Sequence, residues 1–377
     1  MSFASLITPT DIPRQWTASV DAGRVPQAVL LTGAEGSELL PLALELIAYL
    51  QCTNRVSKDG ASFGESCGLC EACRSQERLV HPDVHYTFPV VGSGVTSAQH
   101  LPQWREEVLA NPYLAQSDWL RAQTTDNKLG NINRDEVMRI LHDISMQRFT
   151  EGHRVVMIWG ADYLGDESNR LLKVIEEPPA NTLILLLTSR PERILPTISS
   201  RCRVYRLPPP PVAGIASLLG QRGADSARAS ELAYASGGNI GLALANIERE
   251  QTDEAQPDLA AWLRACFMGK GAAIVKSSLA LATLTREQQK HFLHRVLRFV
   301  RELGVARAGT PQPLRLGPAD AAVANKLASI LAWPQLTDFA EEIEHLYEAV
   351  ERNANGKIAF TASSIRIHHI MARKSQP

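Results

Sequence analysis

Four of the six cysteines in the chain fall in one short stretch of sequence. Thiolate sulfurs are preferred ligands of Zn²⁺, and two-residue spacers let a tight turn aim successive sulfurs at one ion. Four sulfur ligands leave no open coordination position, so the pattern predicts a structural zinc module over 52–73 rather than a catalytic metal. Cys202 and Cys266 stand alone and are predicted to be small core residues. The four predicted ligands are Cys52, Cys67, Cys70 and Cys73.

A second motif has the layout of a phosphate-binding loop without its chemistry. An apolar run ends at Gly33 and is followed by Gly36 and a helical pattern. A P-loop needs glycine, lysine and serine or threonine at its last three positions, because the lysine reaches the phosphates and the hydroxyl ligates Mg²⁺. Acidic side chains there, including Glu35, would repel phosphate at close range. We therefore predict that nucleotide binding is lost. The last three positions hold Glu38, Leu39 and Leu40.

The strand expected to carry the magnesium-binding acid is altered too. Such a strand ends in Asp, which holds Mg²⁺ and orients water. Here the segment 154–159 ends in Trp159. Asp162 lies further along the chain and is interpreted as a turn or cap residue. The loss at both motifs predicts that this chain does not hydrolyse ATP.

The elements that must position these residues alternate between strand and helix in the N-terminal half. Strands are predicted at 28–32, 154–159 and 181–188, with a helix at 167–177, and this order implies a mainly parallel sheet. Four consecutive prolines at 208–211 mark a boundary. The polar stretch 111–131 is interpreted as a surface insertion. After the prolines every pattern is helical, which gives an α/β plus all-α protein with predicted domains 1–208, 209–252 and 253–377.

Composition sets limits on function. The 377 residues carry a formal net charge of -1, which excludes nucleic-acid binding by bulk positive charge. No apolar run reaches the ~20 residues that a membrane span needs, and no signal-peptide pattern is present, so we expect a cytoplasmic protein. Arginine is concentrated in 181–206, and 352–377 contains no acidic residue. The second stretch could face DNA or a partner, but a solvated tail is favoured.

Several stretches resemble the clamp-loader subunits of the AAA+ class, and specifically the ATPase-deficient members. The most specific run covers 169–179, 188–190 and 195–202, with the sequences Asn-Arg-Leu-Leu-Lys-Val-Ile-Glu-Glu-Pro-Pro, Thr-Ser-Arg and Leu-Pro-Thr-Ile-Ser-Ser-Arg-Cys. Further matches lie at 81–83, 238–244 and 353–360. The resemblance covers nearly the whole chain in order. A cysteine cluster also occurs in both the ATPase and the ATPase-deficient subunits of the class.

The resemblance implies a fold and a set of partners. The fold would be an AAA+-like α/β domain with a zinc module, a small helical lid domain and a C-terminal helical collar domain. The chain would be a rigid stator in a hetero-pentamer with clamp-loader ATPase (gamma/tau) and delta subunits. Through that complex it would act on primed DNA and the sliding clamp during replication, as part of a DNA-directed DNA polymerase holoenzyme. The only cofactor implied is structural zinc, with no ATP in its own site.

The resemblance also gives one residue a role in catalysis. Ser200-Arg201-Cys202 matches the arginine-finger motif of the class, so Arg201 would reach the γ-phosphate of ATP bound in a neighbouring subunit. Guanidinium is always charged and presents a planar fork to phosphate oxygens. Ser200 and Cys202 would fix the loop. Gly241 stands where the ATPases carry a sensor arginine, and Arg190 follows a strand where they carry a polar sensor.

Two alternatives remain open at this point. The first is an active AAA+ ATPase subunit, which would bind Mg-ATP. The second is a zinc-dependent DNA-binding protein. The surface predicted around the cysteines has mixed charge and no interleaved aromatic residues, so base stacking is not indicated there.

Overall fold

The computed structural model describes residues 2–57, 63–123, 130–251, 258–309, 314, 316 and 318–373. The chain divides into two compact units, residues 1–247 and 248–377. The predicted domain boundary at 252/253 falls outside the described residues. Among the described helices, none combines the length and the apolar character needed to cross a lipid bilayer.

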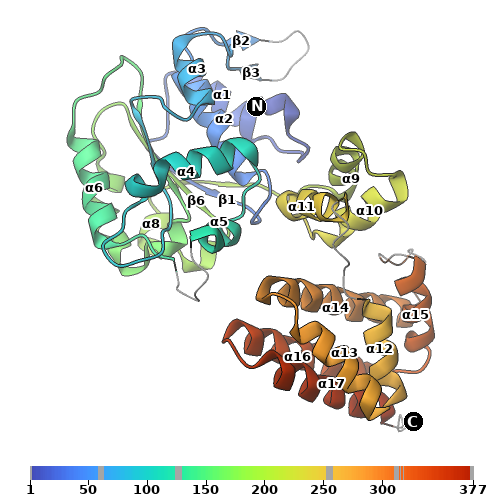
Figure 1. The fold of residues 1–377 in the computed structure, drawn as a ribbon. Coiled ribbons are helices and arrows are strands. Elements are labelled where there is room, and N and C mark those ends of the chain that lie inside the picture. Colours follow the sequence, from blue (N-terminus) through green and yellow to red (C-terminus); the bar gives the residue numbers. More distant parts are fainter. Residues whose placement is uncertain are drawn as a thin grey trace. The chain divides into compact units, whose positions relative to one another are not determined.

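A five-stranded sheet organises the first unit (Figure 1). Every neighbouring pair in it is parallel, which confirms the predicted parallel sheet. Within this sheet the strand order is β4-β5-β6-β1-β7, so β1 lies between β6 and β7 and the crossovers place helices on both faces. The strands are β1 (Ala28–Thr32), β4 (Val84–Thr87), β5 (Arg154–Trp159), β6 (Thr182–Thr188) and β7 (Arg203–Arg206).

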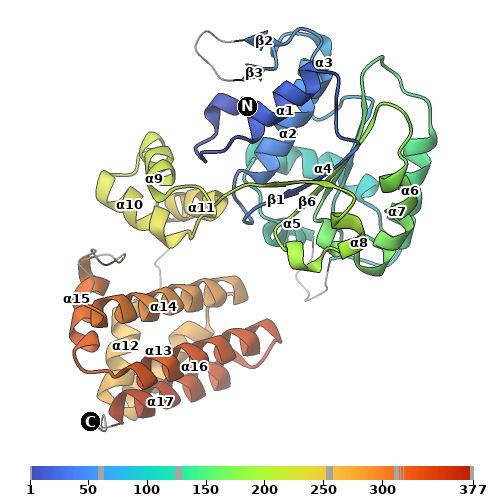
Figure 2. The same cartoon turned by 180° about the vertical axis from the view of Figure 1, so that it is seen from behind.

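The side chains on the two faces of the sheet pack into two separate hydrophobic cores. Alternate side chains of β1 show this, because Val29 and Leu31 enter one core while Ala28 and Leu30 enter the other. The three central strands, β5, β6 and β1, are buried along their whole length, as expected for strands covered on both sides, whereas the edge strand β7 is mostly exposed. Figures 1 and 2 show the sheet from opposite sides. The first core is closed by α1 (Ile12–Asp21), α2 (Leu39–Gln51), α4 (Ser97–Ala110) and α5 (Gln116–Gln123), the second by α6 (Arg134–Ser145), α7 (Leu172–Glu176) and α8 (Pro196–Ser199).

Short elements complete the α/β part. The two-stranded antiparallel pair β2 (Val56–Ser57) and β3 (Gly64–Glu65) precedes α3 (Glu71–Glu77). The helix predicted at 167–177 begins as a 3-10 helix, η3 (Gly165–Leu171), and continues as α7. The other 3-10 segments are η1 (Phe3–Ser5), η2 (Ala161–Tyr163) and η4 (Pro191–Arg193).

The polar stretch 111–131 is not a plain surface insertion, and that prediction was wrong in its described part. Trp119 of α5 is fully buried, and its indole N–H donates to the Pro89 carbonyl at 2.9 Å. Leu114 and Ala115 are buried as well. The error arose because the polar majority of the segment hid a few large residues that pack inward.

Beyond the proline run, three helices share a small core of their own. This core contains Ile215, Leu219, Leu232 and Ile240, and Tyr113 from the α/β part packs against it. Asp225 caps the middle helix by accepting hydrogen bonds from two backbone N–H groups. The helices are α9 (Val212–Gln221), α10 (Ser226–Ala235) and α11 (Ile240–Gln251).

The second unit is helical and has one core. Its last helix, α17, packs against α13 and α16 and buries Phe360 and Ile367 completely. The interpretation of 352–377 as a solvated tail was therefore wrong for most of its length; Lys374 lies outside the described residues. The helices are α12 (Leu259–Met268), α13 (Gly271–Ala282), α14 (Arg286–Arg307), α15 (Pro318–Ala328), α16 (Trp333–Glu351) and α17 (Gly356–Ala372).

The basic residues of this last stretch are largely paired. Arg366 contacts Glu342 at 3.2 Å, and Arg373 contacts Asp338 at 2.6 Å, both acids being on α16. The positive charge is thus used to dock α17 on an acidic helix.

Candidate functional site

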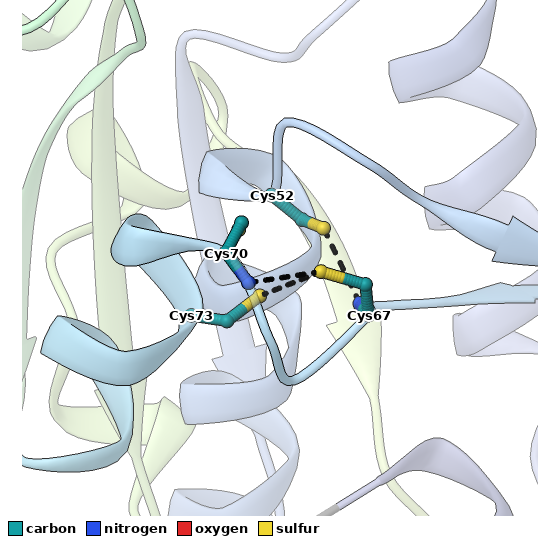
Figure 3. Close-up of side chains that lie close together, drawn as sticks. All are labelled: Cys52, Cys67, Cys70 and Cys73. Atoms are coloured by element: carbon teal, nitrogen blue, oxygen red, sulfur yellow. Dashed lines mark hydrogen bonds between the residues drawn. The ribbon is translucent and has the colours of Figure 1, made fainter.

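Four cysteines from three consecutive segments meet at one point (Figure 3). Their sulfur atoms all lie within 4.8 Å of one another, and the Cys67 and Cys73 sulfurs are 3.9 Å apart. Sulfurs about 2.3 Å from a tetrahedral Zn²⁺ would be separated by about 3.8 Å. Cys52 ends α2, Cys67 follows β3, Cys70 caps the start of α3 and Cys73 lies in the first turn of α3.

Hydrogen bonds lower the pKa of two of these thiols, which favours the thiolate form that binds a cation. The N–H groups of Leu69 and Cys70 donate to the Cys67 sulfur at 3.4 and 3.3 Å. Hydrogen bonds from the Cys70 and Leu69 backbone lower the pKa of Cys67. Burial pushes the pKa of Cys70 upward, but hydrogen bonds from Thr53 and Cys73 outweigh it and lower the value to about 6. Gly68 adopts a φ of 69°, which lets the turn close this tightly.

This four-sulfur centre could hold a metal ion, and the donor set fits a soft or borderline ion such as Zn²⁺. Cys52 and Cys73 are buried, at 4% and 6% exposure, so an ion there would be shielded from water on one side. An ion would cross-link the end of α2 to α3. Cys202 and Cys266 are not part of the centre: Cys266 is buried in the core of the second unit, as predicted, whereas Cys202 is only partly buried beside the second core of the first unit.

The degenerate phosphate loop is closed by its own acidic residue. Glu38 is only 1% exposed, and its two carboxylate oxygens accept hydrogen bonds from the backbone N–H groups of Ile7 and Thr8 at 2.7 and 2.8 Å. A buried carboxylate needs such partners to offset its lost hydration. Leu39 and Leu40, at the positions of the P-loop lysine and hydroxyl, are buried in the first core. The loop therefore offers an apolar and acidic interior to any phosphate.

The same loop holds two further segments. The Gly241 N–H donates to the Gly36 carbonyl at 3.1 Å, and the Ser117 N–H donates to Glu35 at 2.7 Å. Gly36 has a φ of 66°, and a side chain there would meet Asn239 at 2.0 Å. A side chain at Gly241 would meet the Tyr113 carbonyl at 2.4 Å, so an arginine at that position does not fit.

Aromatic rings stand where a magnesium-binding acid would be. Trp159 ends β5, is 3% exposed and lies 6.1 Å from Trp104, measured between ring centroids. Trp104 stacks on Phe88 at 4.9 Å, and Trp119 meets Phe88 edge-on at 5.2 Å. The segment 111–123 therefore contributes Trp119 to the aromatic cluster around Trp159. Asp162 accepts a hydrogen bond from Thr188 at 2.8 Å, which is a local structural contact.

Arg201 lies apart from these contacts, on the surface after α8. Its side chain is 38% exposed. The Nε–H donates to a Glu176 carboxylate oxygen at 3.2 Å, and Nη1 donates to the Thr197 carbonyl at 3.0 Å. Ser200 also donates to the Thr197 carbonyl, and Cys202 is partly buried against the second core, which raises its pKa to about 11. Ser200 and Cys202 thus contact the protein on either side of Arg201.

Most of these features lie in a segment that matches a known protein family. The model of a family described as DNA polymerase III, delta subunit, matches residues 9–211. This is just over half of the chain, and it includes the four-sulfur centre, the closed loop and Arg201. The chain belongs to this family.

Curated relatives agree with the family assignment and with the resemblance found in the sequence. The delta′ subunit of DNA polymerase III from Escherichia coli is 30% identical over 195 residues, covering 52% of this chain and 46% of that protein. The delta′ subunit from Haemophilus influenzae is 26% identical over 200 residues, covering 53% and 48%. The gamma/tau subunit from Mycobacterium bovis is 26% identical over 211 residues, covering 55% and 29%. The matched segment thus spans less than half the length of these relatives.

Among solved structures, a gamma subunit-related protein from Thermotoga maritima aligns with 94% of this chain and 99% of its own. The TM-score is 0.38 and the identity is 14%. The family assignment rests on the sequence matches.

Sequence reasoning missed three contributors to this region. The burial of Glu38 could not be read from its charge, which suggested repulsion of phosphate rather than capping of a backbone segment. The inward side of 111–123 was signalled only by Trp119. The contact of Glu176 with Arg201 joins residues 25 positions apart, and no local pattern reports it.

A metal ion in the four-sulfur centre would tie α3 to α2, so loss of one ligand is expected to loosen this connection. Cys70→Ser should reduce the metal bound to the purified chain from about one equivalent to near zero, because three sulfurs bind far more weakly than four. The melting temperature of the first unit should fall with it. Metal content by elemental analysis and unfolding by circular dichroism test this.

Cys202→Ser is the matched control, since it removes a thiol outside the centre, and it should retain the metal. An unsubstituted chain that folds fully without any bound metal would contradict the prediction.

Loss of the Glu38 contacts is expected to destabilise the first unit. Glu38→Ala leaves the Ile7 and Thr8 N–H groups without their charged acceptor, which should cost about 2–4 kcal/mol, since hydrogen bonds to charged groups contribute about 1.5–3 kcal/mol each. For a unit of this size that corresponds to a fall of roughly 5–10 °C in the melting temperature. Glu177→Ala, at an exposed acid, should leave the melting temperature nearly unchanged. Equal melting temperatures for the two variants would show that Glu38 does not hold this segment.

Proposed function

We propose that this chain is the delta′ subunit of a bacterial DNA polymerase III clamp loader. It acts as a stator that does not bind ATP and that supplies Arg201 in trans to a neighbouring gamma/tau ATPase subunit. In this role it assembles with the ATPase and delta subunits into a hetero-pentamer in the cytoplasm and helps load the sliding clamp on primed DNA. Family membership and the delta′ relatives support the assignment.

The observation that carries the ATP-free role is the state of Glu38. A bound triphosphate needs backbone N–H groups and a lysine around its oxygens. Here a buried carboxylate occupies the loop and uses both oxygens on the protein's own backbone. Placing phosphate beside it would bring like charges together in a poorly solvated space, which strongly disfavours binding.

The surroundings of the loop favour the same role over an active ATPase. Trp159 replaces the carboxylate that would hold Mg²⁺, and its ring is buried among other aromatic rings. Gly241 leaves no room for a sensor arginine. At the described positions where an ATPase would carry its magnesium-binding acid, its lysine and its sensor arginine, this chain has Trp159, Leu39 and Gly241, which supports the proposal that it does not hydrolyse ATP.

Arg201 suits a role in trans because that role requires no nucleotide-binding group in the chain that carries the arginine. Its guanidinium is exposed and lies on a loop whose neighbours Ile198 and Cys202 contact the second core. An arginine supplied by a neighbour can raise phosphoryl transfer by ~10³–10⁵-fold through stabilisation of the charge that develops in the transition state. No ATP in the chain that supplies it is required.

The remaining parts are assigned structural roles. The four-sulfur centre is proposed to hold Zn²⁺, because a closed site with four cysteine ligands is the usual structural zinc arrangement. The proposed domains are 1–208, a lid at 209–252 and a collar at 253–377. Exposed apolar residues on α13 and α17 support an oligomerisation role for the collar. They include Val275, Leu279, Ile358 and Ile365.

The test reconstitutes the clamp loader with variants of this chain. Arg201→Ala should leave assembly intact and reduce DNA-stimulated ATP turnover by the share that comes from the adjoining ATP site, because that site loses its stabilising charge. Assembly is followed by gel filtration, and turnover by phosphate release. The isolated chain should show no binding of Mg-ATP at micromolar concentrations by calorimetry.

Arg193→Ala is the control, because it removes another exposed arginine from the segment between β6 and β7. Its turnover should equal that of the unsubstituted chain. Unchanged turnover with Arg201→Ala removes the finger assignment. Micromolar Mg-ATP affinity favours an active ATPase, and salt-sensitive DNA binding that is lost on chelation favours a zinc-dependent DNA-binding protein.

A further inference from the structure

The hydrogen bonds of Arg201 leave one side of its guanidinium available. The group carries five N–H donors in a fixed plane. Glu176 accepts from Nε–H and the Thr197 carbonyl accepts from Nη1, while Nη2 has no partner in the described part of the chain. The donors that remain are both N–H groups of Nη2 and one of Nη1. Two adjacent terminal nitrogens of this kind can bind two phosphate oxygens together.

The two residues that accept hydrogen bonds from Arg201, Glu176 and Thr197, are carried by helices that share one hydrophobic core. Glu176 ends α7 directly after Ile175, and Thr197 lies in α8 directly before Ile198. Ile175 and Ile198 are 3% and 2% exposed and belong to the same core. The helices α7 and α8 are in contact. The acceptor for Nε and the acceptor for Nη1 are therefore fixed relative to each other by packing.

We propose that Glu176 is a positioning residue for Arg201. It holds the guanidinium by Nε so that Nη1 and Nη2 point toward the γ-phosphate of ATP in the neighbouring subunit. The inference rests on the proposed role of Arg201 as a finger and adds to it a residue that sets the finger's orientation. The Glu176 carboxylate stays in place when phosphate binds, because it accepts from Nε–H, whereas the phosphate oxygens would accept from Nη1 and Nη2.

The physical gain is preorganisation. An arginine side chain has many rotamers, and ordering it at the moment of contact opposes the contact. A guanidinium already held at Nε loses less freedom when it meets phosphate. Since a misplacement of ~1 Å at a reacting group can cost ~10²-fold in rate, loss of the holding group should appear in kcat.

Folding stability, in contrast, should hardly depend on this pair. The Arg201 and Glu176 side chains are 38% and 57% exposed. Ion pairs at such exposed positions contribute little to stability, because water screens the charges and both side chains lose freedom. A change at Glu176 therefore separates positioning from stability.

The test compares Glu176→Ala, Glu176→Gln and Glu177→Ala in the reconstituted clamp loader. Glu176→Ala should lower the part of kcat that depends on Arg201 by about tenfold, with KM for ATP unchanged, because the finger acts in the transition state. Glu176→Gln keeps an oxygen that accepts from Nε–H and should retain most of the turnover. Glu177→Ala removes the adjacent exposed acid and should behave as the unsubstituted chain. Melting temperatures and gel filtration should be the same for all.

Arg201→Ala run in parallel separates the two proposals. If Arg201→Ala lowers turnover and Glu176→Ala does not, the positioning role is overturned and the finger stands. If Arg201→Ala leaves turnover unchanged, the finger fails and the role of Glu176 fails with it. An equal loss with Glu176→Ala and Glu177→Ala would indicate a general effect of surface charge and would also overturn the positioning role.

Discussion

The buried carboxylate of Glu38 is the contact on which the arrangement of the first unit depends. A charge that is 1% exposed is tolerated only when it is fully hydrogen-bonded, and here the N–H groups of Ile7 and Thr8 provide those bonds. The loop that contains it also holds Gly241 through Gly36 and Ser117 through Glu35. Three segments far apart in the sequence thus meet at this one loop. The protein's own hydrogen-bonding groups therefore hold these segments together at the loop.

The closed loop and Arg201 lie at opposite ends of the parallel sheet. The loop follows β1, Arg201 follows β6 through α8, and the Gly33 N–H donates to the Thr188 carbonyl at 3.3 Å, which joins the two strand ends. Parallel strands deliver their carboxyl ends to one edge, where ligand chemistry is usually placed. In this chain the inner part of that edge is filled by Trp159, Trp104 and Trp119. Arg201 precedes β7, whose first residue pairs with Val29 near the start of β1, so it lies away from that edge and outside the closed loop.

The sequence predicted what depends on local spacing and failed where distant residues decide. The x2 spacing of Cys67, Cys70 and Cys73 predicted a centre that the structure assembles, and the apolar runs predicted parallel strands. The helix α17 was missed because its buried residues are spread over a segment whose basic residues suggested solvent, and the acids that pair with them lie on α16. Trp119 was missed for a related reason, since its burial is created by Phe88 and Pro89 on another segment. A periodic pattern reports the face of one element, but it does not report the partner that covers it.

Glu38 and Glu176 show how burial gives one residue type two different roles. At Glu38 desolvation makes each hydrogen bond costly to lose, so the carboxylate contributes to the stability of the fold. At Glu176 the solvent screens the charge, and the contact with Arg201 contributes little to folding. The exposed pair still restricts the directions in which the guanidinium can point, because the helices that carry its two acceptors share one core. If Arg201 acts in trans as proposed, stability and the orientation of its guanidinium are determined by different carboxylates in this chain.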